Sequence, residues 1–133
     1  MTGIALMDLR PFKISEDVAV PRGQLVEMIR AVRRIGVKYG FETASYGHAG
    51  DGNLHVNFLF RSADERARGE AAIDEAIETA IRLGGTITGE HGVGLAKRRF
   101  LPKEQGDAVV ALQKRLKRAF DPEDLLNPGK IFP

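Results

Sequence analysis

The most regular pattern in the chain is an alternation of apolar and polar residues over positions 53–60. Four apolar residues and three polar ones take turns along this segment: Leu54, Val56, Phe58 and Phe60 with Asn53, His55 and Asn57. This two-residue period is typical of a β-strand with one face in a core and the other facing something polar. Further strands are predicted over 12–20 and 41–46, with a short one over 86–88.

Apolar residues at helical spacing mark three helices. The clearest runs over 64–83, where the buried stripe is predicted to be Ile73, Ala76, Ile77, Ala80 and Ile81. An earlier helix begins after Pro21, which suits a first helical turn, and ends near residues 36–40. A last helix is predicted over 103–120, where Asp121 and Pro122 end it, and an extended apolar tail follows over 125–132.

The order of these elements is β-α-β-β-α-β-α, which predicts an α+β fold. We expect an antiparallel sheet with helices on one face, related to the ferredoxin-like arrangement, plus the C-terminal helix and the extended tail. Residues 1–11 carry no clear pattern and are predicted to be an irregular N-terminal segment. Residues 12–133 are predicted to form one domain, a size that can bury a core.

Composition excludes several classes of protein and site. The chain has no cysteine, which excludes disulfides, thiolate metal sites and Cys nucleophiles and fits a reducing, cytoplasmic location. No apolar run approaches the roughly 18 residues of a membrane span, and the N-terminus lacks the layout of a secretory signal. A net charge of +2 is too small to indicate nucleic acid. Phe58 and Phe60 share the apolar face of their strand, so they are not predicted to stack on bases.

Basic residues nevertheless gather in three places: Arg30, Arg33 and Arg34; Lys97, Arg98 and Arg99; and Lys114, Arg115, Lys117 and Arg118. We interpret them as solvated helix faces. The alternative is a docking surface for a polyanion or an acidic partner protein.

All three histidines lie in two glycine-rich segments. His48 opens the turn over 47–52, His55 follows on the polar face of the next strand, and His91 directly follows Glu90 in the second segment. Two imidazoles and a carboxylate form a common site for a divalent transition metal. We therefore predict His48, His55 and Glu90 as metal ligands and His91 as an acid/base group, because imidazole titrates near neutral pH.

A simpler interpretation of the same residues remains open. Isolated histidines are usually surface or hydrogen-bonded residues, and glycine-rich turns are common for purely conformational reasons. Asp51 then caps a turn, and Asn57 satisfies a backbone group. The concentration of every histidine in these two segments favours a functional site without deciding it.

Four segments resemble a known family. Residues 47–57 (GHAGDGNLHVN) and 89–94 (GEHGVG) are similar to the paired signatures of the FAD-linked oxidase C-terminal domain, and 16–21 (EDVAVP) and 126–130 (LNPGK) match its flanks. This domain occurs in D-lactate dehydrogenase, D-2-hydroxyglutarate dehydrogenase and the glycolate oxidase flavoprotein subunit. The resemblance implies the substrate- and metal-binding part of an FAD-dependent flavoprotein oxidoreductase, which oxidises a 2-hydroxy acid such as glycolate or D-lactate to the 2-oxo acid.

The resemblance also implies roles for individual residues. The residues matching His48, His55 and Glu90 hold a divalent metal, often zinc, and those matching Asn57 and His91 contact the substrate and take its hydroxyl proton. Asn127 lies in a tail that returns to the flavin, so we assign it to cofactor binding. Some relatives carry a substrate-binding lysine where this chain has Ser15, and we assign that role to Lys13, two residues further back on the same strand face.

The expected cofactors are therefore FAD, held mainly by a flavin-binding domain that these residues do not include, and a divalent metal, zinc in the first place. The expected partners are that flavin-binding domain or subunit and the 2-hydroxy acid; a second copy of the chain and an iron–sulfur electron-acceptor subunit are further candidates. We expect an enzyme fragment or subunit that is inactive alone. The alternative from another class is a stand-alone metal-binding or regulatory module without catalysis of its own.

Overall fold

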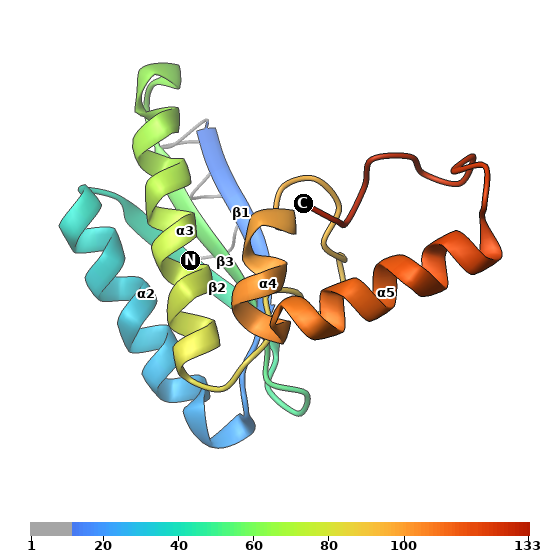
Figure 1. Cartoon of the computed structure of the whole chain (residues 1–133). Helices are drawn as coiled ribbons and strands as arrows, with labels where there is room; N and C mark the ends of the chain where they lie inside the picture. Colours follow the sequence, from blue (N-terminus) through green and yellow to red (C-terminus); the bar gives the residue numbers. More distant parts are fainter. Residues whose placement is uncertain (1–11) are drawn as a thin grey trace. The chain divides into compact units, whose positions relative to one another are not determined.

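The computed structural model describes residues 12–133 and divides the chain into two compact units, the first ending at Glu90 and the second covering His91–Pro133 (Figure 1). The predicted irregular segment over 1–11 lies outside the described residues. Each unit is built around its own elements. No helix within residues 12–133 combines the length and the apolar character needed to span a membrane.

The first unit is built on a three-stranded antiparallel sheet. Its strands are β1 (Phe12–Ala19), β2 (Glu42–His48) and β3 (Asn53–Phe60), in the spatial order β1-β3-β2. The alternation read along 53–60 turns one face of the central strand into the core, where Val56 and Phe58 are 1% and 0% exposed. The residues that alternate with Val56 and Phe58 along β3, such as His55, therefore face the opposite side of the sheet.

Two helices, α2 (Leu25–Tyr39) and α3 (Arg66–Arg82), pack on the sheet and on each other (Figure 1). Short 3₁₀ turns precede them, at Arg22–Gln24 and Ala63–Glu65. Met28 and Val32 of α2 and Ile77 of α3 are fully buried. Burying a side chain of this size contributes roughly 1.5–3 kcal/mol. The α+β class and its antiparallel sheet are thus confirmed.

The strand predicted over 86–88 does not form. Thr86 makes a single antiparallel bridge with Ala19, through Ala19 N–H to Thr86 O at 3.2 Å and Thr86 N–H to Ala19 O at 2.7 Å. Beyond that bridge, the Thr88 hydroxyl and the Glu90 N–H bond to the side chain of Asp17 instead of continuing a backbone ladder. The segment therefore leaves the sheet after one pairing, and the sheet keeps three strands.

The second unit contains a 3₁₀ turn at Arg98–Phe100 and two helices, α4 (Leu101–Gln105) and α5 (Asp107–Phe120). The prediction of one continuous helix over 103–120 is wrong. Gly106 adopts φ +78° and ψ 156°, a backbone conformation that residues other than glycine rarely adopt. The chain turns there between the two helices. Residues 103–107 (KEQGD) carry no apolar spacing, and Gly106 followed by Asp107 was the turn signal in the sequence that this prediction missed.

The tail after α5 is anchored by one buried carboxylate. Asp121 accepts hydrogen bonds from the backbone N–H groups of Leu125 and Leu126, both at 2.9 Å. Further along, the Ile131 N–H bonds to the carbonyl oxygen of Gly94 at 3.0 Å. The tail therefore folds back within its own unit.

A stripe of apolar side chains on α5 is exposed. Val109, Leu112, Leu116 and Phe120 recur at helical spacing, and Phe120 is 85% exposed. Val110, one residue from the stripe, is buried. Helix α5 thus carries an exposed apolar stripe beside one buried valine.

Candidate metal centre

The histidines lie on the sheet face opposite the core. In the antiparallel register His55 of β3 stands between Asp17 of β1 and Tyr46 of β2, and His48 pairs with Asn53 one row further along. Directly paired residues share a face of an antiparallel sheet, and Leu54, Val56, Phe58 and Phe60 of β3 occupy the other face. The hairpin that joins β2 to β3 therefore brings both imidazoles to the same end of one polar face.

Glu90 reaches this end of the sheet from the segment that follows α3. Its Oε1 lies 2.9 Å from Nε2 of His55. One candidate ligand atom from each of His48, His55 and Glu90 lies within 4.8 Å of the others, and the two imidazole centroids are 6.5 Å apart. The structure thus brings together the three residues predicted as metal ligands.

The donor set suits a divalent transition metal. Two imidazole nitrogens and one carboxylate oxygen are ligands that zinc takes at about 2.0–2.2 Å, usually with a fourth position left for water or substrate in catalytic sites. Two donors at these distances from one ion lie at most about 4.4 Å apart, so any pair near the 4.8 Å limit has to move closer when an ion binds. His48 and Glu90 are exposed, which leaves their side chains room to rotate.

The ring of His55 is further fixed by Tyr46. The two ring centroids lie 5.1 Å apart with an interplanar angle of 37°, and His55 itself is half-buried. Packing against an aromatic ring restricts the rotation of an imidazole. Tyr46 is a neighbour of the site that the sequence did not single out, although its alternation with His48 along the strand would have placed both on one face.

Glu90 is held in place by a second residue that the sequence did not assign to the site. Asp17 is 0% exposed, and its Oδ2 accepts the Glu90 backbone N–H at 2.5 Å. The Thr88 hydroxyl lies 3.4 Å from both carboxylate oxygens. The sequence offered one signal for Asp17: it is an acidic residue directly before the apolar run Val18–Val20. An acidic side chain in such a place is rarely buried without partners.

The close approach of Gly89 to Asn53 allows Glu90 to come this near. A Cβ at position 89 would overlap the Asn53 side-chain oxygen and would lie 2.6 Å from its Cγ. Asn53 is buried, and its Oδ1 has no hydrogen-bond partner within residues 12–133. The absence of a side chain at 89 is therefore a steric requirement of this part of the site.

The residues predicted to bind substrate lie on the same face as His55. Asn57 pairs with Ser15 and Lys13 pairs with Leu59, so both follow His55 along the sheet. Asn57 is 3% exposed and donates from Nδ2 to the Ala44 carbonyl at 3.0 Å. In the described part of the chain its Oδ1 is buried without a hydrogen-bond partner, and Lys13 is exposed.

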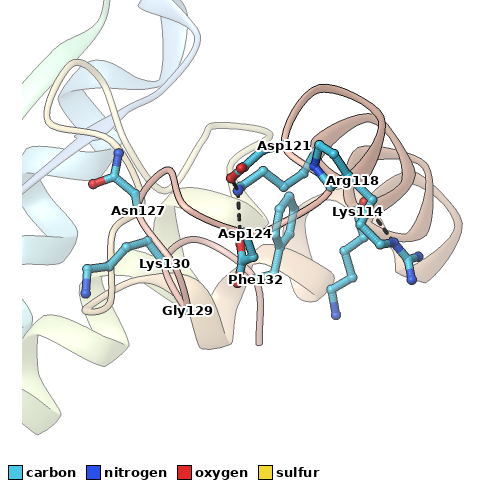
Figure 2. A pocket seen from close by; sticks show the side chains of 10 residues that line it. Lys114, Arg118, Asp121, Asp124, Asn127, Gly129, Lys130 and Phe132 are labelled. Atoms are coloured by element: carbon cyan, nitrogen blue, oxygen red, sulfur yellow. Dashed lines mark hydrogen bonds and ion pairs between the residues drawn. The ribbon is translucent and has the colours of Figure 1, made fainter.

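The other two predicted residues belong to the second unit. His91 is its first residue and is exposed. Asn127 is exposed in the tail, where it has φ +51°. It lies at the edge of a pocket of about 420 Å³ between α5 and the tail (Figure 2).

The charged side chains that line this pocket do not converge on one point. Figure 2 shows Lys130 at one end and Lys114 and Arg118 at the other. Figure 2 shows Asp121 and Asp124 between these ends, and the carboxylates of both are paired with Lys117. These hydrogen bonds, led by the one to Asp121, raise the pKa of Lys117, and Lys117 in turn lowers the pKa of Asp121. The pairing serves to fix the tail.

Comparison with known proteins identifies the family. Residues 2–131 match the family described as FAD linked oxidases, C-terminal domain. The chain belongs to this family. The resemblance carried by the two glycine-rich segments is therefore confirmed, and both segments lie at the candidate metal centre or directly after it.

Among the relatives of this FAD-linked oxidase domain is the glycolate oxidase subunit GlcD of Bacillus subtilis, 47% identical over 130 residues, which are 96% of this chain and 28% of that protein. The mitochondrial D-lactate dehydrogenase [cytochrome] of Kluyveromyces lactis is 42% identical over 116 residues, 87% of this chain and 20% of that protein. The D-lactate dehydrogenase of Anaerostipes hadrus is 34% identical over 118 residues, which are 86% of this chain and 25% of that protein.

The chain thus spans between a fifth and just over a quarter of the length of these relatives. The names of these relatives describe a glycolate oxidase subunit and D-lactate dehydrogenases.

Proposed function

We propose that this domain binds the substrate and a divalent metal in an FAD-dependent enzyme that oxidises a 2-hydroxy acid, of the glycolate or D-lactate type, to the 2-oxo acid. The observation that carries the proposal is the convergence of His48, His55 and Glu90, with ligand atoms within 4.8 Å of one another. The names of the relatives, a glycolate oxidase subunit and D-lactate dehydrogenases, support the choice of substrate class.

The roles of the residues follow from their chemistry. His48, His55 and Glu90 hold the metal, with zinc as the first candidate. A divalent metal bound there supplies Lewis acidity to the hydroxyl and carboxylate oxygens of a 2-hydroxy acid. The unpaired Oδ1 of Asn57 accepts a hydrogen bond from the substrate, and Lys13, further along the same face, attracts its carboxylate.

His91 takes the proton from the substrate hydroxyl oxygen as general base. The hydrogen on the adjacent carbon leaves with its electron pair and needs an acceptor, which is the chemistry that FAD supplies in this family. Because no group of this chain accepts that hydride, we propose that the domain is inactive without a flavin-binding domain or subunit. Asn127 in the tail is the residue of this chain that we expect to meet the flavin.

The first experiment measures metal content by elemental analysis of the purified chain. We expect about one metal ion per chain in the parent and none in the double variant His48→Ala/His55→Ala. His91→Ala is the matched control, because it also removes a histidine from the same region but should keep the metal. Loss of metal from His91→Ala, with retention in the double variant, would contradict the ligand assignment.

The second experiment adds a cognate flavin-binding domain and follows bleaching of the flavin absorbance on addition of glycolate or D-lactate. Restored, substrate-dependent bleaching is expected. His91→Ala should slow it by roughly 10²- to 10⁴-fold while the metal content stays the same, which is the usual contribution of a general base. A chain that keeps its metal but never supports bleaching with any such domain would favour the stand-alone metal-binding module instead.

The exposed stripe on α5 is the surface that we assign to the flavin-binding portion. Val109, Leu112, Leu116 and Phe120 form an exposed apolar stripe, the kind of surface that often marks an interaction site, and the relatives contain roughly three to four times more chain than this domain. The double variant Leu112→Ser/Leu116→Ser should weaken association with that portion in a pull-down without lowering the metal content. A parent chain that instead forms homodimers, abolished by the same variant in size-exclusion chromatography, would assign the strip to a second copy.

A further inference from the structure

The geometry points to Asp17 as a positioning residue: its buried carboxylate holds the backbone of Glu90 so that the Glu90 side chain meets His55. This inference rests on the proposed function, because it concerns the same metal centre. Asp17 acts through the backbone of Glu90, whose N–H it accepts.

Asp17 sits where the two halves of the site meet. In the sheet it is the direct cross-strand partner of His55, so the register of β1 on β3 sets its position. Through its side chain it accepts the Glu90 N–H at 2.5 Å and faces the Thr88 hydroxyl at 3.4 Å. One residue thus joins the strand that carries a histidine ligand to the segment that carries the carboxylate ligand.

The need for a carboxylate follows from the geometry of the donors. Thr88 and Glu90 approach from the same segment, which has just left the sheet at the Ala19–Thr86 bridge. A carboxylate offers two acceptor oxygens and no donor, so it can serve both groups at once. An amide in the same place offers one acceptor oxygen and brings two hydrogens that need acceptors of their own.

A purely packing role would not explain the burial of this charge. An ionised carboxylate removed from water is costly unless hydrogen bonds replace its hydration, and apolar side chains fill such positions elsewhere in β1, as Val18 does. Asp17 accepts the Glu90 N–H and faces the Thr88 hydroxyl, and both groups belong to the segment that delivers Glu90. Residues that orient a metal ligand in this way typically raise metal affinity by 10- to 100-fold.

The first test examines the metal-free chain by NMR, through hydrogen exchange of individual backbone amides. In the parent, the Glu90 amide should be protected by Asp17. In Asp17→Asn protection should fall, and in Asp17→Ala it should be lost. The matched control is Asp121→Asn, which alters another buried carboxylate that accepts backbone N–H groups, and it should speed exchange at Leu125 and Leu126 but not at Glu90.

The second test measures Co²⁺ binding by its visible absorption, which reports both affinity and coordination geometry. We expect affinity about tenfold weaker in Asp17→Asn and about 100-fold weaker in Asp17→Ala, with an altered spectrum, because the amide still offers one acceptor to Glu90. Asp121→Asn should bind Co²⁺ like the parent. If Asp17→Ala does not fold, as judged by circular dichroism, Asp17→Asn decides the question.

The two tests together decide whether Asp17 positions Glu90 for metal binding. Faster Glu90 exchange together with weaker Co²⁺ binding supports the positioning role. Unchanged Glu90 exchange in folded variants, or Co²⁺ affinity within twofold of the parent despite faster exchange, overturns it. A parent chain that binds neither Co²⁺ nor Zn²⁺ contradicts the proposed metal-binding function. The exchange experiment then still decides whether Asp17 holds the backbone of Glu90.

Discussion

Gly89→Ala is the sharpest steric test of how the segment carrying Glu90 is packed. The added methyl group would overlap the Asn53 side-chain oxygen and approach the Asn53 Cγ and Nδ2 to 2.6 and 3.1 Å. The whole amide group would have to move, and Asn53 is only 6% exposed, so little free space surrounds it. We therefore expect either the Asn53 side chain or the 88–90 segment to shift.

Overpacking of this kind costs roughly 1–3 kcal/mol. That range lowers the ratio of folded to unfolded chain about 5- to 150-fold, and with a urea slope of roughly 2 kcal/mol/M it moves the unfolding midpoint down by about 0.5–1.5 M. Metal affinity should fall in parallel, because Glu90 is the next residue and its carboxylate meets His55 at 2.9 Å.

Gly50→Ala is the matched control. Position 50 lies in the turn between the two histidine-bearing strands, and a Cβ there would meet nothing within 4 Å. Its backbone is outside the left-handed region, so alanine should leave stability equal to or slightly above that of the parent. Urea unfolding and Co²⁺ titration of both variants decide the matter. Equal midpoints and equal affinities for the two variants would refute the steric argument.

Three further predictions concern stability away from the metal centre. Ser62→Ala removes the capping box before α3 and should cost about 1 kcal/mol in urea unfolding. The hydrogen bond from Lys38 lowers the pKa of Glu75, and a carboxylate with a lowered folded-state pKa stabilises the chain above its unfolded-state pKa and stops doing so as the pH falls through the folded-state value. Glu75→Gln should therefore be less stable than the parent near neutral pH and match it in acid, in urea unfolding at both pH values. Asp121→Ala should expose the tail to limited proteolysis near Leu125, because that carboxylate holds the amides of the tail.

Local patterns predicted much of the first unit. The alternation along β3 placed Val56 in the core and His55 on the opposite face, and the spacing along α3 placed Ile77 in the core. The two histidines are joined by a short hairpin, so their proximity could be inferred from residues close in sequence. These elements depend on period and turn chemistry, which are local properties of the chain.

The errors arose where distant residues or one backbone angle decided the outcome. The residues at 86–88 have strand propensity, but hydrogen bonds from Thr88 and Glu90 to Asp17, some 73 residues earlier, draw the segment off the sheet. The sequence also did not predict which face of the sheet Asp17 occupies, because that depends on how β1 pairs with β3. A shift of one residue in this register would have turned Asp17 to the other face. In the last helix, the backbone angles of Gly106 separate α4 from α5.

The position of Glu90 in the chain gives the metal centre a second consequence. Roughly 35 residues, including all of α3, separate it from His55. An ion shared by these two side chains would act as a cross-link that closes a loop around the helix and restricts the unfolded ensemble. A covalent link across a loop of that size removes unfolded-state entropy worth roughly 4 kcal/mol. A chelator would then do more than empty the site: it would release the end of α3 to separate from the hairpin and lower the temperature at which the first unit unfolds.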